Sequence, residues 1–254
     1  MGLHPFRLKQ TPASEERNKT QRTENAVPVS EVFFSIQGEG VNAGTPSVFL
    51  RTFTCNLTCT WCDTKYTWVD QDKAIPGKEY QPLSSEEIIA KVSSFGCDHL
   101  VVTGGEPLLH QRMLGPLIAQ LKRSGFYVEV ETNGTIAPSA GMVERVDLFN
   151  VSPKISNSLV DETVRTRPEA IAAFVRSRKA WFKFVIKEKR DVAEVEALLS
   201  RFLIPRDRVL LMPEGVDPET LSERGRWLVE VCKDKGLRFS PRLHVMLFGN
   251  VRGT

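Results

Sequence analysis

The sequence predicts an α/β fold, an incomplete TIM-type barrel of about six parallel strands with helices on the outside. Two observations carry this prediction. The chain has 254 residues and 41% hydrophobic content, which suits one α/β barrel-type unit. Short apolar runs also alternate with helical segments, and repeated strand and helix units imply a parallel sheet.

Six short apolar runs are typical of the strands of such a sheet. Each is rich in β-branched or aromatic residues and ends at turn-forming or polar residues. We expect strands at 47–53, 100–103, 127–131, 148–151, 181–186 and 209–212.

Helix-boundary residues separate these strands. Ser84 and Glu87 form a capping box, which predicts a helix that ends near Gly96. The same reasoning predicts four more helices: one over 108–123 that stops at Gly125, one through 170–175, one with Asp191 and Glu194 in capping positions, and one from Asp217-Pro218 to Gly236.

Composition narrows the class of protein. The 34 basic and 31 acidic residues nearly balance. The sequence has no concentrated basic patch with interleaved aromatics, so we expect no direct nucleic-acid binding. No apolar run approaches the ~20 residues that span a bilayer, so we expect no membrane association. Residues 1–26 are polar, lack a signal-peptide core and predict a disordered extension before one domain at 27–254. We therefore expect a cytoplasmic protein.

Three of the five cysteines lie close together, in the run TCNLTCTWCDT. Cys55, Cys59 and Cys62 offer three thiolates from one loop. Structural zinc sites are closed by four ligands, whereas a 4Fe-4S cluster held by three cysteines keeps one iron open. Zinc remains an alternative on spacing alone. Cys97 and Cys232 have no neighbouring ligand, and the odd count argues against a disulfide framework.

Polar or glycine-rich clusters follow most of the predicted strands. Because the carboxyl ends of parallel strands meet at one edge of the sheet, these clusters are expected to converge on one site. They are the cysteine loop and residues 104–107, 132–134, 152–154 and 213–215.

The cysteine loop followed by Gly104-Gly105-Glu106-Pro107 resembles the radical S-adenosylmethionine (SAM) superfamily. The resemblance implies a 4Fe-4S cluster on the three cysteines, whose open iron binds SAM and whose electron cleaves it to a 5′-deoxyadenosyl radical. An external electron donor, flavodoxin-like or ferredoxin-like, is implied as well. The residues implied to bind SAM are Trp61, Asp63, Gly104, Gly105, Glu106, Ser152, Pro153 and Lys154.

The flanking segments are similar to a narrower family over about 28–254. They are FSIQGEG at 34–40, FLR at 49–51, CDT at 62–64, PRLH at 241–244 and FGN at 248–250. Together they look like 7-carboxy-7-deazaguanine synthase. The family rearranges 6-carboxy-5,6,7,8-tetrahydropterin with loss of ammonia, a carbon–nitrogen lyase step toward queuosine, and a homodimer is implied.

The residue chemistry agrees with this substrate. A carboxylated pterin needs a guanidinium for its carboxylate and polar groups for its ring edge, which points to Arg51. By resemblance, Thr64 supplies a hydroxyl ligand to Mg²⁺, and residues 249–254 are a candidate lid over the pterin. The expected substrate contacts are Ile36, Gln37, Gly38, Glu39, Arg51, Thr103, His244 and Thr254. No side chain is singled out as a general base.

Two other functions remain open at this stage. A glycyl-radical enzyme activase shares the cysteine spacing but acts on a protein, and does not account for Gln37-Gly38-Glu39-Gly40. An iron–sulfur electron carrier would have four clustered thiolates, whereas three cluster here.

Overall fold

The computed structural model describes residues 26–68, 75, 77 and 79–254 and contains all six predicted parallel strands. Each pairs in parallel with the next one along the chain. They are β2 (Pro46–Thr52), β4 (His99–Gly104), β5 (Tyr127–Thr132), β6 (Leu148–Val151), β7 (Ala180–Ile186) and β8 (Val209–Pro213).

Three further strands were not predicted. β1 (Val27–Ile36) is antiparallel to both β2 and β3 (Gln81–Leu83), and β9 (Arg238–Phe239) extends the other edge in parallel with β8. Pro28 and a register shift between Val29 and Glu31 interrupt the regular pattern of β1. The sheet order β3-β1-β2-β4-β5-β6-β7-β8-β9 does not close on itself, so the predicted incomplete barrel is confirmed.

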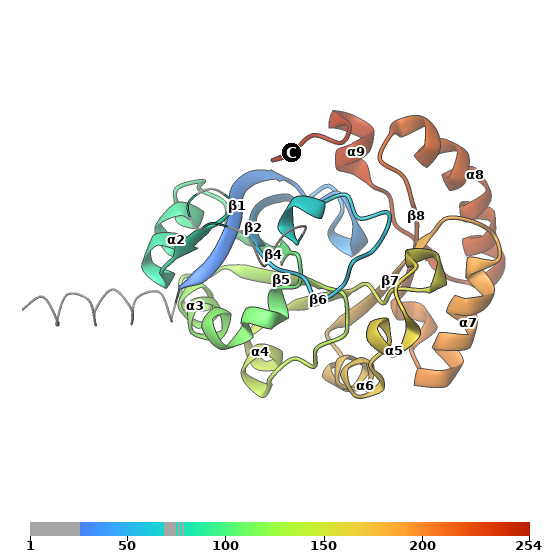
Figure 1. Ribbon diagram of the computed structural model, residues 1–254, viewed down its shortest axis with the longest axis horizontal. Coiled ribbons are helices and arrows are strands. Elements are labelled where there is room, and N and C mark those ends of the chain that lie inside the picture. The colour runs from blue at the N-terminus through green and yellow to red at the C-terminus, as the bar shows by residue number, and fades with distance from the viewer. Residues whose placement is uncertain (1–25, 69–74, 76, 78) are drawn as a thin grey trace, which may run out of the picture.

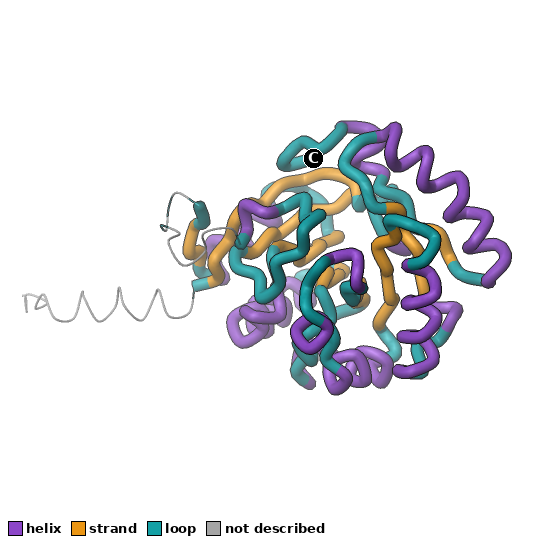
Figure 2. The backbone as a smooth tube through the Cα atoms, turned by 45° about the vertical axis from the view of Figure 1, so that its right-hand side comes forward, coloured by secondary structure: helices purple, strands orange, loops and turns teal. Residues whose placement is uncertain are grey.

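The helices lie on the outside of the curved sheet (Figure 1). Tube and ribbon views agree that the strands form the inner layer (Figure 2). The helices are α2 (Ser85–Ser93), α3 (Gln111–Arg123), α4 (Ala140–Arg145), α5 (Glu162–Arg165), α6 (Pro168–Ser177), α7 (Asp191–Phe202), α8 (Pro218–Lys235) and α9 (Leu243–Phe248).

Local capping explains where several helices begin. The predicted capping box of Ser84 and Glu87 opens α2, and Asp217 caps α8. The prediction that Asp191 caps α7 is wrong, because Arg190 occupies the N-cap. The Asp191 carboxylate instead accepts backbone hydrogen bonds from the preceding loop, at Lys187 and Glu188. The predicted helix at 108–123 begins as the 3₁₀ turn η4 (Pro107–His110) and continues as α3.

The core lies between the sheet and the helices. Phe149 on β6 and Phe174 on α6 are fully buried and meet edge to face with ring centroids 5.4 Å apart. Phe182 and Phe184 on β7 are buried on the same layer. Burying each such side chain contributes about 1.5–3 kcal/mol, which fixes the strands whose ends build the site.

The predicted extension at 1–26 lies outside the described residues except for Ala26, so its disorder and the domain boundary stay predictions. Within the described chain, no helix has the length and apolar composition to cross a membrane. Cys97 is half-buried and Cys232 is buried on α8, in line with structural roles for both.

Candidate active site

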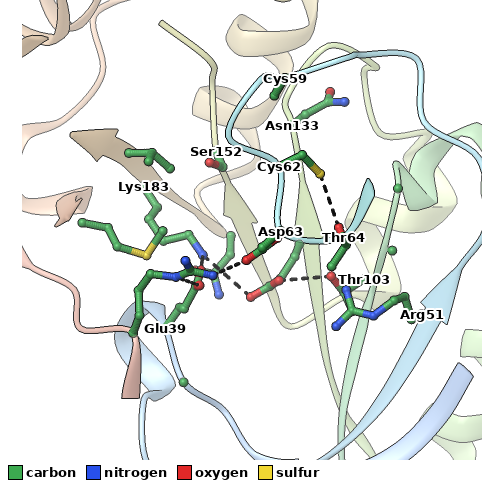
Figure 3. Close-up of a pocket in the computed structure, with 18 of the residues that line it drawn as sticks. Glu39, Arg51, Cys59, Cys62, Asp63, Thr64, Thr103, Asn133, Ser152 and Lys183 are labelled. Carbon is green, nitrogen blue, oxygen red and sulfur yellow. Dashed lines mark hydrogen bonds and ion pairs between the residues drawn. The ribbon is translucent and has the colours of Figure 1, made fainter. Parts of the chain in front are cut away.

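One pocket lies at the carboxyl ends of the parallel strands and gathers side chains from positions between Phe33 and Thr254 (Figure 3). Cys55, Cys59 and Cys62 line it together, on the loop that follows β2. Residues that follow β4, β5, β6 and β8 line the same pocket. The predicted convergence of these clusters is therefore present.

Backbone packing holds the cysteine loop against the end of β4. A Cβ on Gly105 would lie 2.1 Å from the carbonyl oxygen of Thr54, and one on Gly104 would lie 2.3 Å from that of Thr52. Such contacts are too short for any side chain. The Gly105 and Glu106 amides donate to these same carbonyls at 3.2 and 2.9 Å. The two glycines thus let β4 and the loop touch directly.

The sulfur atoms have donors suited to thiolate ligands. Trp68 donates its indole N–H to Cys62 Sγ at 3.3 Å, and the Leu57 amide donates to Cys55 Sγ at 3.5 Å. Such hydrogen bonds tune the potential of iron–sulfur clusters. Burial raises the pKa of Cys55 to about 11, so its thiol stays protonated until a metal displaces the proton.

Three cysteines on one loop match the ligand number of a 4Fe-4S cluster that keeps one iron open. In the described part of the chain, no three His, Cys, Asp or Glu side chains converge closely enough to hold one metal ion. A 4Fe-4S cube places each cysteine on a different iron, so its ligands need not meet at one point. A structural zinc site would need a fourth ligand beside these three cysteines.

A buried ionic network forms the other side of the pocket. Arg242 donates from Nε to Glu39 Oε1 at 2.9 Å, and its Nη groups bind Asp63 and the carbonyl of Gly215. Lys183, from the middle of β7, binds the second oxygen of Glu39. Figure 3 shows this network on the opposite side of Asp63 from the cysteine loop. Asp63 thus connects the sulfur side of the pocket with the Glu39 side.

Charge pairing decides the ionisation of this network. Burial alone would raise the pKa of Glu39, but Lys183, Arg242 and His244 hold it far below its ordinary value. Burial would likewise lower the pKa of Lys183, and Glu39 with Glu131 raises it instead. Glu39 and Lys183 are therefore both charged at neutral pH.

Arg51 lies on β2 and reaches the pocket from the opposite wall. Its Nε donates to Glu31 Oε1 at 2.7 Å, and its side chain is 16% exposed. This contact uses Nε alone, and no described residue accepts a hydrogen bond from either of the two Nη groups. The guanidinium is oriented by one edge and keeps a pair of parallel donors for a ligand carboxylate.

Gln37 is held by carboxylates from β5. Its amide nitrogen donates to Glu129 Oε1 at 2.7 Å and to Glu131 Oε1 at 3.3 Å, and its Oε1 accepts from the Glu39 amide at 3.2 Å. Thr103 donates to the other oxygen of Glu131 at 3.1 Å. The amide protons of Gln37 are used within the protein, so it faces a ligand mainly as an acceptor.

His244 covers the turn that carries the predicted Gly38. A Cβ on Gly38 would lie 1.9 Å from His244 Nδ1, and the Leu243 amide donates to the Gly38 carbonyl at 2.8 Å. Burial lowers the pKa of His244. The first turn of α9 is thereby fixed against residues 36–39.

The SAM-side predictions divide into two groups. Lys154 lies 5.2 Å over the Trp61 ring and donates to Ser152 at 3.0 Å, so these three residues form one wall. Glu106 and Pro153 are buried and do not line the pocket. The Glu106 carboxylate accepts from Leu108 N, Thr132 Oγ1 and Asn133 N, at 2.9, 2.9 and 2.7 Å. It thus braces the end of β5.

All other predicted site residues line the pocket. For the SAM and magnesium sets these are Trp61, Asp63, Thr64, Gly104, Gly105, Ser152 and Lys154, and for the substrate set Ile36, Gln37, Gly38, Glu39, Arg51, Thr103, His244 and Thr254.

Sequence reasoning missed several polar residues of the pocket. Glu131, Asn150 and Lys183 lie inside strands, and Arg242 had no role beyond its place in the PRLH segment. A lysine within the apolar run AWFKFVI was the available indication, because a charge in a buried strand needs a partner.

Comparison with known proteins agrees with this geometry. Residues 49–187 match the model of the radical SAM superfamily. The chain is 42% identical to the 7-carboxy-7-deazaguanine synthase of Pyrobaculum aerophilum, over 89% of this chain and 97% of that one. It is 36% identical to the enzyme of the same name from Halobacterium salinarum, over 90% and 93%.

A solved structure leads to the same family. The crystal structure of QueE from Escherichia coli matches with a TM-score of 0.68 and 28% identity, over 88% of this chain and 96% of that one. The superfamily implies a 4Fe-4S cluster and SAM as cofactors. Relatives that are named as synthases favour an enzyme over the electron carrier and over the activase. The chain is therefore a radical SAM enzyme, and it belongs to the 7-carboxy-7-deazaguanine synthase family.

Proposed function

We propose that the chain converts 6-carboxy-5,6,7,8-tetrahydropterin to 7-carboxy-7-deazaguanine with loss of ammonia, a step toward queuosine. When bound, the cluster and SAM would supply the 5′-deoxyadenosyl radical that removes hydrogen from C6 of the pterin, with SAM regenerated afterwards. The observation that carries the proposal is one pocket lined by the three cysteines and by Arg51, Gln37 and Glu39. The relatives that match this chain over most of its length carry the same product, 7-carboxy-7-deazaguanine, in their name.

Different residues of the pocket would bind different parts of the substrate. Arg51 would bind the pterin carboxylate through its Nη groups, because Glu31 already holds its Nε. Glu131 and Glu39 would accept from the amino and ring N–H groups of the pyrimidine edge, and Gln37 Oε1 would align with them. These contacts orient the ring and exclude water; none of them transfers a proton.

Magnesium has a candidate ligand beside the cysteine loop. Thr64 Oγ1 lies 3.6 Å from Cys62 Sγ and lines the pocket. It would provide one hard oxygen to Mg²⁺, and the substrate carboxylate and water would complete the shell. A cation there would offset charge that develops during ring contraction.

The test is an anaerobic assay of cluster-reconstituted protein with SAM, Mg²⁺, a strong reductant and the carboxylated pterin, followed by mass spectrometry. We expect 7-carboxy-7-deazaguanine without proportional loss of SAM. Formation of 5′-deoxyadenosine without that product would retain the radical chemistry and reject this substrate. Omitting Mg²⁺ should slow product formation; an unchanged rate would remove magnesium from the proposal.

Two associations belong to the same proposal. The electron would come from a flavodoxin-like or ferredoxin-like donor, and the chain would act as a homodimer. Both are expected from the family. Replacing the chemical reductant with each reduced carrier tests the donor, and sedimentation equilibrium of the full chain tests the dimer.

A further inference from the structure

The segment after α9, residues 249–254, crosses back to β1 and ends at the pocket. Figure 1 shows the carboxyl-terminal end of the chain beside β1. Thr254 lines the pocket, and Phe248, Gly253 and Thr254 lie against Phe34 and Ile36 in a neighbouring shallow groove. The segment is otherwise exposed, with Val251 58% accessible. Something must hold it against the pocket wall for Thr254 to stay there.

Arg252 makes the polar contacts that hold the segment. Its Nε lies 3.0 Å from Glu31 Oε2, and its guanidinium stacks 4.2 Å above the Tyr66 ring. Nη2 reaches the carbonyl and hydroxyl oxygens of Ser30 at 3.4 Å. In the described part of the chain, no other hydrogen bond or ion pair joins residues 250–254 to another element.

Glu31 serves the pocket as well as the segment. Its Oε1 accepts from Arg51 Nε at 2.7 Å and from the Tyr66 hydroxyl at 2.6 Å, while Oε2 is left for Arg252. The Glu31 side chain is 14% exposed, so its ion pairs are less screened than those of a surface carboxylate. Tyr66, Arg51 and Arg252 together outweigh burial and keep the pKa of Glu31 below its ordinary value.

We infer that Arg252 is a positioning residue: by binding Glu31 and Tyr66, it latches residues 249–254 over the pocket and ties their closure to the orientation of Arg51. The consequence for the substrate rests on the proposed function, whereas the latch itself does not. If substrate binds tightly only beneath the closed segment, its apparent dissociation constant equals the intrinsic one divided by the closed fraction. Replacing Arg252 therefore weakens binding although Arg252 itself does not line the pocket.

The first measurement needs neither cofactor nor substrate. Chymotrypsin can cut after Phe248, which is 47% exposed, and the cut releases residues 249–254. When opening is fast, the cleavage rate follows the population of the open state. We expect Arg252→Ala to weaken closure about tenfold, since an ion pair and a cation–π contact are lost together. For a segment that is closed about three-quarters of the time, this accelerates release about threefold. Arg252→Lys keeps the positive charge but loses the planar stack on Tyr66, so its release rate should lie between those of the wild type and Arg252→Ala.

Arg201→Ala is the matched control. Arg201 is 53% exposed, as Arg252 is, pairs with Glu162 at 3.0 Å and lies over Phe202 at 5.0 Å, but these partners belong to α5 and α7 and do not hold residues 249–254. Its loss should leave the release of 249–254 at the wild-type rate. A latch is rejected if Arg252→Ala releases the segment no faster than Arg201→Ala does.

The second measurement tests the consequence for the ligand. Anaerobic equilibrium dialysis of the cluster- and SAM-loaded enzyme gives the dissociation constant of 6-carboxy-5,6,7,8-tetrahydropterin. In a two-state segment the fold-rise in release and the fold-rise in this constant multiply to the change in the closure equilibrium, so we expect about a threefold rise in Arg252→Ala, with turnover at saturating pterin changed by less than about twofold. Faster release with unchanged pterin affinity would reduce Arg252 to a surface contact and overturn the positioning role. Absence of product in the wild type would reject the proposed function, and the proteolysis result would still decide the latch.

Discussion

Replacing Arg242 with methionine should destabilise the protein more than any exposed arginine does. The Arg242 side chain is 8% exposed and its guanidinium binds Glu39, Asp63 and the Gly215 carbonyl. These partners come from the loop after β1, the cysteine loop and the loop after β8. The substitution keeps an apolar stem of similar length and removes all the charge-assisted bonds.

The expected loss of unfolding free energy depends on the contacts that each partner of Arg242 keeps after the substitution. Removing one member of a buried ion pair costs about 3–5 kcal/mol. Glu39 keeps its ion pair with Lys183, and Asp63 is 32% exposed and can be hydrated by water. Both effects reduce the destabilisation. The Gly215 carbonyl loses a charged donor, worth about 1.5–3 kcal/mol. We expect about 3 kcal/mol in total, the lower end of the range, or a fall in Tm of about 6–12 °C for a chain of this size.

Urea and thermal unfolding of the metal-free, reduced protein measure this difference without relying on catalysis. Arg201→Met serves as control, because it breaks a half-exposed pair with Glu162 at 3.0 Å. That variant should lose less than about 1 kcal/mol. The limit for a surface ion pair is about 1 kcal/mol. If the free energies of unfolding of Arg242→Met and Arg201→Met differ by less than this limit, the network does not hold the three loops together.

Three further outcomes are expected. Cys59→Ser should abolish the visible absorbance and iron content of the reconstituted cluster, whereas Cys97→Ser should retain both. The folded-state pKa of Glu39 is depressed below its ordinary 4.5, so its share of stability is full above that pH and is lost as pH falls further; urea unfolding should show a shallower acid slope in Glu39→Gln. Deleting residues 249–254 should raise the KM for the pterin, and unchanged steady-state kinetics would show that the segment does not cover the substrate.

Much of the site was predictable because loop position follows from strand order. Once the sheet is parallel, residues after each strand must gather at one edge, and Cys55, Gly104 and Ser152 do so. The antiparallel β1 was not predictable in this way. It carries Gln37 and Glu39 to the pocket from an edge of the sheet, and Pro28 obscures its alternation.

Residues inside strands were harder to predict for a geometric reason. Alternation in YVEVET assigns Glu129 and Glu131 to the face opposite Val128 and Val130, but does not say whether that face meets water or a barrel interior. Here Glu129 is fully buried and bound by Gln37, while Glu131 lines the pocket. Only the curvature of the whole sheet decides whether this face meets water or the barrel interior. That curvature depends on packing between segments, which the sequence of one strand does not show.

The pairing of charges explains why a ligand carboxylate would select one cation from several. Lys183 and Arg242 both face the pocket, but Glu39 occupies them, and Arg242 also holds Asp63. Drawing either cation away would remove one of the two partners of the buried Glu39 carboxylate, and losing one member of a buried ion pair costs about 3–5 kcal/mol. Arg51 differs because Glu31 takes only its Nε and lies outside the pocket lining. An anion that enters between the cysteine loop and the strand ends therefore gains more at Arg51 than at Lys183 or Arg242, because binding at Arg51 requires no internal pair to break.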